Sequence, residues 1–372
     1  MPTTLGLGKN DRSSSVATAS QWQLMFWRFK KHRLAHIGAY IVLAFYIIAV
    51  LCEFIAPYMP TTYNSSLAFA PPQRIRFIDY EGNLHLRPFV YGWKKEFDLE
   101  TFETTYVPDT DQRFRLRFLL KGEPYKFMGV FPGSLRLFGV EDGYFHLFGT
   151  DNLGRDLFSR IIYGARISMS IGLLGVVVSF ILGMLIGGFS GYRGGMFDLI
   201  TQRVIEFLRS IPTIPLWMSL AAALPKNWSA IQNYFAITVI LSLLGWTGLA
   251  REVRSKFMAL REEDFITAAR LSGTSELMII TRHMIPSFMS HIITAMTLAI
   301  PAMILGETSL SFLGVGLQPP VVSWGVLLQQ AQNLRSVALA PWLMLPGLFV
   351  FVVVLAFNFL GDGLRDAADP YS

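Results

Sequence analysis

The chain has 372 residues, of which 52% are hydrophobic and only 16% are charged, and its formal net charge is +6. Soluble domains carry charge on about a quarter of their residues, so this composition is typical of a polytopic membrane protein. Its single cysteine, Cys52, excludes an intrachain disulfide and a cysteine-based metal site. The positive charge fits basic cytoplasmic loops better than nucleic-acid binding, so the expected surroundings are a lipid bilayer.

The first 33 residues are interpreted as a cytoplasmic tail followed by an interfacial helix. The tail is rich in Ser, Thr and Gly and has no periodicity, which is typical of disorder. The stretch QWQLMFWRFKKHR then places Trp22, Phe26 and Trp27 among basic residues, as in helices that lie at a membrane surface. The apolar run that follows has no cleavage pattern, so we predict a first transmembrane helix at residues 34–57 and not a signal peptide.

Six apolar runs of about 20 residues predict an all-α polytopic membrane protein with six transmembrane helices. The third run is the weakest, because it contains Arg203, Glu206 and Arg209 as well as Pro212 and Pro215. The runs cover residues 34–55, 167–192, 199–224, 231–250, 286–306 and 340–360.

Basic residues predict the orientation of the helices. Lys and Arg are concentrated in residues 28–33 and in the connection at residues 251–282. With six spans both segments lie on one side of the membrane, and the positive-inside rule makes that side cytoplasmic. Both termini are therefore expected in the cytoplasm, and residues 58–148 are expected outside.

The outer segment has the period-two pattern of β-strands, in QRIRFIDY, NLHLRPFVYG and RFRLRFLLKG. The intervening EGN is a plausible hairpin turn. Arg113, Arg115 and Arg117 would share one face of a strand, with Phe114, Leu116 and Phe118 on the other. We predict a small β-rich periplasmic insertion between the first and second spans; a loosely packed loop is the alternative.

Motifs for catalysis or cofactor binding are absent from the sequence. It contains no GxxxxGK[ST] phosphate loop, no HExxH and no GxSxG, and its six histidines have no metal-ligand spacing. The chain is therefore not expected to be an enzyme or to hold a cofactor or a metal.

The connection before the fifth span contains EEDFITAARLSGTSELMIITRHMIPS, residues 262–287. Its acidic start suits a helix N-terminus, and Phe265, Ala268, Ala269 and Ser272 recur at helical spacing as a face of small residues behind one aromatic. Gly273 is a natural helix stop, and Thr274 or Ser275 can begin a new helix. We predict a short helix that inserts into a partner's groove; an amphipathic connector on the membrane surface is the alternative.

This segment resembles the EAA loop of ABC importer permeases of the oligopeptide, dipeptide and nickel type. Thr267 departs from the pattern, because a Glu gives the loop its name. Residues 147–172, 203–216 and 305–328 also resemble segments of that subfamily, in the same order. The positions that match the loop are Glu263, Asp264, Phe265, Ala268, Ala269, Arg270, Gly273, His283 and Pro286.

The resemblance implies a permease subunit of an ATP-driven importer in the bacterial inner membrane. Such a subunit moves peptides or similar small solutes from periplasm to cytoplasm by alternating access. Its implied partners are a second homologous permease, two ATPase subunits that hold ATP and Mg²⁺, and a periplasmic solute-binding protein. The permease core would be residues 149–362 with an ATPase-coupling loop at 251–286, followed by a cytoplasmic tail at 363–372. Peptide, oligosaccharide, nickel and opine-like solutes remain open.

Two acidic residues are candidates for the translocation path. Glu206 could line it, or could simply pair with Arg203 and Arg209 on its own helix. Glu307 could line the cavity, or lie in the aqueous outer layer. Asp151, Arg155 and Asp156, before the second span, are interpreted as a helix-capping, polar surface segment.

Two other function classes remain as alternatives. An ion-coupled carrier acting alone would be expected to show inverted repeats and charged residues in mid-span, and no such repeat is visible. A membrane enzyme or assembly factor built around the outer segment would need clustered catalytic residues there. Co-purification of an ATPase distinguishes the permease from both.

Overall fold

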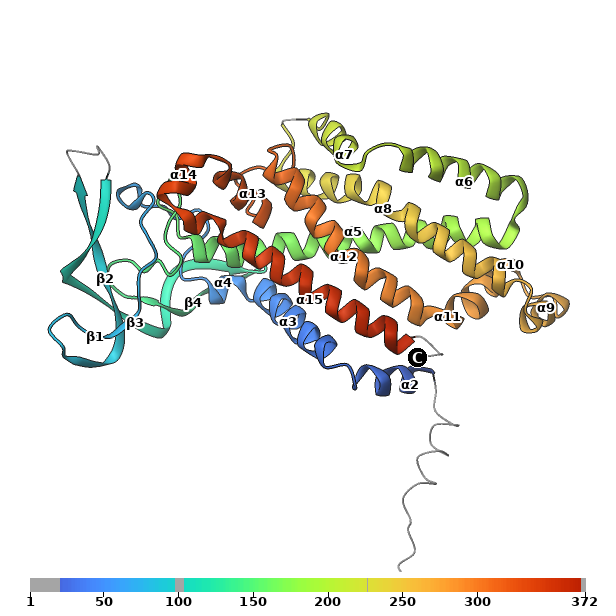
Figure 1. Ribbon diagram of the computed structural model, residues 1–372, viewed down its shortest axis with the longest axis horizontal. Helices are drawn as coiled ribbons and strands as arrows, with labels where there is room; N and C mark the ends of the chain where they lie inside the picture. Colours follow the sequence, from blue (N-terminus) through green and yellow to red (C-terminus); the bar gives the residue numbers. More distant parts are fainter. Residues whose placement is uncertain (1–20, 98–103, 226, 369–372) are drawn as a thin grey trace, which may run out of the picture.

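Long apolar helices run along one axis of the molecule, and a small antiparallel sheet lies at one end of them (Figure 1). The computed structural model describes residues 21–97, 104–225 and 227–368. Within these residues, 5 helical segments are long and apolar enough to cross a membrane. They are α3 (Arg33–Val50), α5 (Leu157–Arg193), α8 (Ala230–Leu260), α12 (Met289–Phe312), and Pro341–Ala368, which joins η4 (Pro341–Met344) to α15 (Leu345–Ala368).

The third predicted span is not one continuous helix. It is divided into α6 (Gly195–Ser210) and α7 (Thr213–Ala222), and neither is among the candidate membrane spans. The break falls at Ile211 and Pro212, both of which have extended ψ angles. The proline ring disfavours a helical conformation in the preceding residue, so the helix ends before Pro212.

Two helices extend well beyond their apolar runs. α5 begins ten residues before the predicted span at 167, and α8 continues ten residues past its predicted end at 250. A cap accounts for the extended start of α5, because Asp156 accepts a hydrogen bond from the Ser159 N–H. At its own start, α8 has a capping box formed by Ser229 and Gln232. The loop expected at 251–286 therefore begins only after Leu260, and the tail expected at 363–372 is helical as far as Ala368.

α5 and α8 pack closely because glycines recur on the contact face of α5. Gly183, Gly187 and Gly191 lie four residues apart, and a side chain at any of them would meet α8. At Gly187 the obstruction would be the backbone of Ala250, which cannot move aside as a side chain could. α12 packs against both helices of this pair.

The sheet has four strands in the order β1-β2-β3-β4, and each pairs antiparallel with the next. The turn between β1 and β2 is the predicted EGN hairpin, with Gly82 at φ 90°. Arg113, Arg115 and Arg117 are exposed, as predicted from the alternation. On the opposite face Leu116 is buried, whereas Phe118 is 72% exposed. The strands are β1 (Arg76–Ile78), β2 (Leu84–Phe97), β3 (Thr104–Phe127) and β4 (Phe131–Val140).

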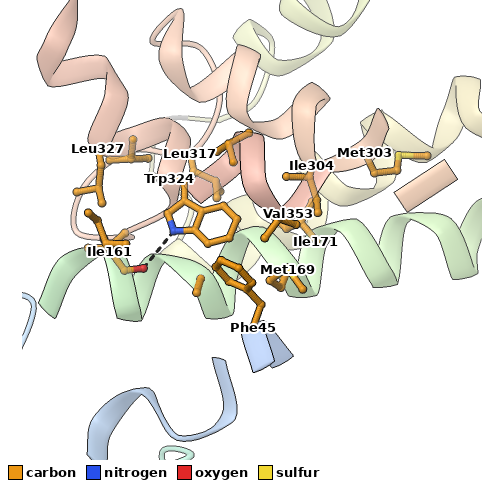
Figure 2. Close-up of a cluster of buried hydrophobic side chains, with 14 of the residues drawn as sticks. Phe45, Ile161, Met169, Ile171, Met303, Ile304, Leu317, Trp324, Leu327 and Val353 are labelled. Atoms are coloured by element: carbon orange, nitrogen blue, oxygen red, sulfur yellow. Dashed lines mark hydrogen bonds between the residues drawn. The ribbon is translucent and has the colours of Figure 1, made fainter. Parts of the chain in front are cut away.

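The core of the helical part surrounds Trp324, whose side chain is fully buried (Figure 2). Its indole N–H donates to the Ile161 carbonyl at 3.1 Å, and its ring meets Phe45 edge-on at 5.8 Å between centroids. Ile304 of α12 and Val353 of α15 belong to the same buried cluster as Trp324. One residue of α13 (Trp324–Gln329) thus connects the first, second, fifth and sixth predicted spans.

Short elements lie at both ends of the bundle. α2 (Gln21–Phe29) exposes Phe26 and Trp27, as expected of an interfacial helix; the Trp22 side chain lies outside the described residues. The remaining short elements are α4 (Cys52–Ile55), η1 (Ser65–Leu67), α9 (Asp264–Leu271), α10 (Glu276–Met278), η2 (Ile279–Met284), α11 (Ile285–Ser287), η3 (Gln330–Gln332) and α14 (Leu334–Leu339).

Candidate functional site

The loop that follows α8 lies at the end of the bundle opposite the sheet (Figure 1). Glu263 is the N-cap residue of α9 and Asp264 its first residue, so negative charge lies where the helix dipole favours it. α9 ends as predicted at Gly273, whose φ of 78° suits glycine. The Gly273 N–H donates to the Arg270 carbonyl, and the Thr274 N–H donates to the Ala269 carbonyl. The loop is therefore an ordered helix and not a flexible connector.

α9 has an inner and an outer face. Ile266 and Ala269 are buried in a hydrophobic cluster with Phe257 of α8 and Met284 of η2. Ala269 is thus a correction to the predicted docking face, because its side chain packs against the protein's own helices. Phe265 and Leu271 are 44% and 85% exposed, and Ala268 is exposed beside them.

Two contacts attach the loop to the end of α5. The Arg270 guanidinium lies 5.0 Å from the centroid of the Tyr192 ring, and its Nε donates to the Tyr192 hydroxyl at 3.3 Å. Glu276 lies 3.7 Å from Arg193, in an exposed pair that contributes little. The stacked arginine is the more specific contact, because a planar guanidinium fits an aromatic face.

The chain from the loop into α12 is irregular. η2 is a single π-helical turn, a feature that is frequent at functional sites, and it contains the half-buried His283. Pro286 lies in the first turn of α11, where its missing N–H costs little, and Phe288 then interrupts the helix before α12. The new helix expected to begin at Thr274 or Ser275 starts with Ser275 as its N-cap residue, whereas the π-helical turn had no recognised signal in the sequence.

A buried carboxylate connects α5, α12 and α13 near the outer end. Glu307 is fully buried and accepts hydrogen bonds from the hydroxyls of Ser168, Ser311 and Ser323, at 3.3, 2.8 and 2.6 Å. Each serine in turn accepts a backbone N–H, from Trp324, Leu317 and Val326 respectively. Glu307 therefore neither lies in an aqueous layer nor lines a cavity wall in this conformation; it fixes α13 to the bundle.

Glu206 is exposed on α6 and pairs with Arg203 at 2.7 Å, which is the i, i+3 pairing expected from the sequence. One turn further, Arg209 lines an open cavity of about 360 Å³ between α6, α7, α8 and α12. Trp217 and Gly245 also line it, and the indole nitrogen of Trp217 is buried without a hydrogen-bond partner. No motif in the sequence singles out Trp217 or Gly245.

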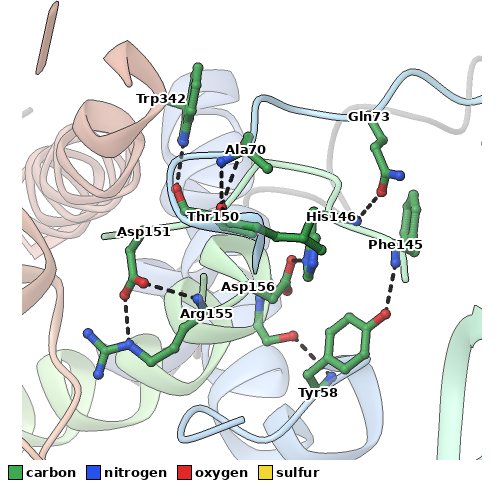
Figure 3. A network of polar contacts seen from close by, with 12 residues as sticks. Tyr58, Ala70, Gln73, Phe145, His146, Thr150, Asp151, Arg155, Asp156 and Trp342 are labelled. Carbon is green, nitrogen blue, oxygen red and sulfur yellow. Dashed lines mark hydrogen bonds and ion pairs between the residues drawn. The ribbon is translucent and has the colours of Figure 1, made fainter. Parts of the chain in front are cut away.

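The segment before α5 caps the helix through Asp156, as predicted, but it is a buried polar network and not the expected polar surface, because Asp151 and Asp156 are buried (Figure 3). Asp151 accepts hydrogen bonds from the backbone N–H groups of Leu153 and Arg155, at 2.9 and 3.0 Å. It also forms ion pairs with the Arg155 guanidinium, at 2.7 Å, and with the buried Arg160. His146 Nδ1 lies 2.9 Å from Asp156 Oδ1. These contacts join the sheet, the start of α5 and, through the Trp342 indole that donates to the Thr150 carbonyl, the last span.

The described residues include no group of three or more His, Cys, Asp or Glu side chains that could hold a metal ion. At the loop end, α9 packs an apolar inner face against the bundle and leaves its outer face exposed.

Comparison with known proteins identifies the family. Residues 156–371, more than half of the chain, match the binding-protein-dependent transport system inner membrane component, and residues 20–72 match the N-terminal transmembrane domain of oligopeptide transport permease C. The chain belongs to this family of inner membrane transport components. It is the non-catalytic permease subunit of an ABC importer, whose ATPase and binding protein are separate subunits.

Relatives with assigned names are permeases of the same kind. The dipeptide transport system permease protein DppC of Bacillus subtilis (strain 168) is 39% identical over 227 residues, covering 60% of this chain and 68% of that protein. DppC of Lactococcus lactis subsp. cremoris (strain MG1363) is 30% identical over 376 residues, covering 99% of this chain and 96% of that protein. The Lactococcus protein therefore also matches the region of the sheet.

A solved structure of the MetNI methionine ABC transporter in inward-facing conformations aligns with 56% of this chain and 97% of that chain. The TM-score is 0.40 and the identity 16%, so the family assignment depends on the sequence matches.

Proposed function

We propose that this chain and a second permease of related sequence form the path through which an ABC importer moves peptides into the bacterial cytoplasm. The names of the relatives, which are dipeptide and oligopeptide permeases, support peptides as the solute class. Uptake of labelled dipeptides and longer peptides by cells with and without this subunit tests that choice. Uptake of an oligosaccharide, and not of peptides, would contradict it.

We further propose six crossings, with α6 and α7 together supplying the third. Their 16 and 10 residues would span about 24 and 15 Å at 1.5 Å per residue, enough together for a hydrocarbon layer of about 30 Å. Arg251, Arg254, Lys256 and Arg261 near the loop favour a cytoplasmic position for it. Both termini then lie in the cytoplasm, and the sheet lies in the periplasm as an insertion between the first two spans.

The observation that carries the coupling role is the division of α9 into a buried and an exposed face. A partner ATPase that held Phe265, Ala268 and Leu271 in a groove would move α9 as a whole. Ile266 and Ala269 would pass that motion to α8 and η2, because a packed apolar cluster resists compression. Arg270 would pass it to α5 through Tyr192.

The same loop contains the other residues assigned to coupling. Glu263 and Asp264 stabilise the start of α9, Gly273 ends it, and His283 and Pro286 lie on the irregular connection to α12. We propose that this connection transmits movement of the loop into α12, whose outer half is held by Glu307. Closure of the ATPase dimer on ATP would then change which side of the membrane the path faces.

For the path itself we propose the open cavity between α6, α7, α8 and α12. Arg209 provides a charged group on its wall, and the exposed Glu206 lies one turn from Arg209. Glu307 is not proposed to contact solute in this conformation, because its carboxylate is fully buried and bonded to three serines.

The coupling role is tested by Leu271→Asp, with Leu86→Asp as the matched control. Both leucines are exposed, at 85% and 99%, but they lie at opposite ends of the molecule. We expect Leu271→Asp to lower co-purification of the ATPase subunits by about tenfold or more, since 1.4 kcal/mol of docking free energy is a factor of ten. Uptake should fall with it, while the amount of inserted permease stays unchanged. Equal co-purification by the two variants would contradict the docking role.

A further inference from the structure

The hairpin between β3 and β4 has an apolar, exposed tip. Met128, Val130 and Phe131 are 52%, 69% and 66% exposed. The turn closes through the Val130 N–H, which donates to the Phe127 carbonyl at 3.0 Å, and Met128 and Gly129 both have positive φ angles, 51° and 76°. Hairpin turns with two positive φ angles normally use Asn, Asp or Gly. A methionine at the first position makes the turn apolar where a water-exposed turn would be polar.

The hairpin runs along the segment that leaves the first span, toward the membrane. Near its base, Glu123 accepts hydrogen bonds from the Met59 N–H at 3.2 Å and the Thr62 hydroxyl at 2.7 Å. On the opposite strand, the buried Arg136 donates to the carbonyls of Ala56 and Glu53, at 3.0 and 2.6 Å. Figure 1 shows β4 next to α4 accordingly.

The tip itself is level with the outer end of the first two spans. The Met128 N–H donates to Glu53 Oε1 at 3.3 Å, and Glu53 pairs with Arg166 of α5 at 2.5 Å. Arg166 also donates to the carbonyls of Ala49 and Val50 at the end of α3. Beyond Arg166, residues 167–192 of α5 contain no charged residue. The Glu53–Arg166 pair therefore marks the outer boundary of the hydrocarbon layer, and the exposed tip lies at that boundary.

Charge on the hairpin agrees with a lipid surface. Lys121 and Lys126 are exposed on β3 behind the tip, with stems long enough to reach lipid phosphates while the apolar tip lies deeper. Glu123, on the same strand, is already bonded to Met59 and Thr62.

We propose that the β3–β4 hairpin tip, residues 127–131, inserts into the outer interface of the lipid bilayer. The sheet is then attached to the membrane at two places, through the chain that leaves α4 and through this tip. The occupant is lipid, because the tip is continuous with the lipid-facing surface of the first span and is apolar where the headgroup region begins. This contact does not depend on which solute is transported.

The test is site-specific fluorescence in the assembled importer, reconstituted in vesicles of phosphatidylethanolamine and phosphatidylglycerol. Val130→Cys is labelled with an environment-sensitive dye, and Leu86→Cys, near the start of β2 and 99% exposed, is the water-exposed control. The wild-type chain controls for background, since its single Cys52 is fully buried. Two quenchers are compared, a nitroxide carried by the lipid near its headgroup and aqueous iodide.

We expect the dye at residue 130 to have blue-shifted emission. Nitroxide lipid should quench most of its fluorescence, and iodide should quench little of it. The dye at residue 86 should show the reverse. Quenching by iodide at residue 130 as strong as at residue 86 would overturn the proposal in favour of a water-exposed tip. Protection from both quenchers would also overturn it, because the tip would then be covered by protein such as the second permease.

Discussion

At the outer end of the helices charged side chains are buried and paired, whereas at the loop end they are exposed. Asp151 and Arg160 are almost fully buried, and each has partners within the chain. Glu263 and Asp264 at the start of α9 are exposed. The outer end therefore completes its own interactions, while the loop end leaves an apolar and acidic surface for another molecule.

This difference fits the parts that the two ends have in a permease. A buried network of hydrogen bonds and ion pairs rigidifies the elements it joins, which suits the base of α5 and the attached sheet. A surface that exposes Phe265 and Leu271 would be unfavourable in water without a partner. The loop end is thus the expected place of contact with the ATPase.

The largest effect is expected from Asp151→Ala. Removing this carboxylate leaves Arg160 buried without its ion pair, and breaking a buried pair costs about 3–5 kcal/mol. Thermal unfolding of the detergent-solubilised protein measures the loss. Asp142→Ala, which removes an exposed acid nearby, should have little effect. Equal melting temperatures for the two variants would show that the outer network is not a stabilising element.

A smaller effect is expected from Glu307→Ala, which leaves three buried serine hydroxyls without their acceptor. A buried polar group without a partner costs about 1–3 kcal/mol. Glu307→Gln keeps one carbonyl oxygen, so its melting temperature should lie between those of Glu307→Ala and the wild type. The same melting experiment gives the order, and wild-type stability of Glu307→Ala would contradict the role of Glu307 in fixing α13.

A local and pH-dependent effect is expected at the β1–β2 turn. The hydrogen bond from His85, together with those from the backbone of Asn83 and Glu81, holds the pKa of Asp79 well below its ordinary range. Because the native pKa is the lower one, the contribution to stability is present above the ordinary Asp value of about 3.9 and is lost as the pH falls toward the native value. Hydrogen exchange at residues 80–84 should accelerate below about pH 4. The Asp79→Asn variant should lack this step; a step that persists would assign it to another group.

The smallest effect is expected from Glu206→Gln. Glu206 and Arg203 are exposed, at 59% and 73%, and such pairs contribute about 0–1 kcal/mol. Melting should be unchanged within error. A specific loss of uptake without a loss of stability would favour a place for Glu206 in the translocation path.

The sequence was sufficient where a local rule determines the structure. Gly273 ends α9 because the left-handed conformation suits glycine, and the alternation around Arg113 identified a strand because side chains alternate in direction. The family resemblance was also visible in the loop. The break before Pro212 had a signal in the proline itself, but the apolar composition around it favoured one continuous span.

Other features depend on residues far apart in the chain. Glu307 is bonded to Ser168, 139 positions away, so its burial could not be read from its own segment. Helical spacing placed Ala269 on one face with Phe265 and Ala268, because spacing alone does not say which side of a short helix packs inward. The positions of Phe257 and Met284 decide that, and they are set by the packing of α8 and η2.

The most direct test of the coupling surface uses two neighbouring residues, Ala268 and Ala269. Ala268 is exposed on α9, whereas Ala269 is buried against the bundle, and the single native Cys52 is buried. Ala268→Cys and Ala269→Cys are compared for cross-linking to cysteines around the groove of the ATPase subunit in the assembled importer. We expect a cross-link from residue 268 and none from residue 269. Cross-linking from residue 269 alone, or from neither, would contradict docking through the exposed face of α9.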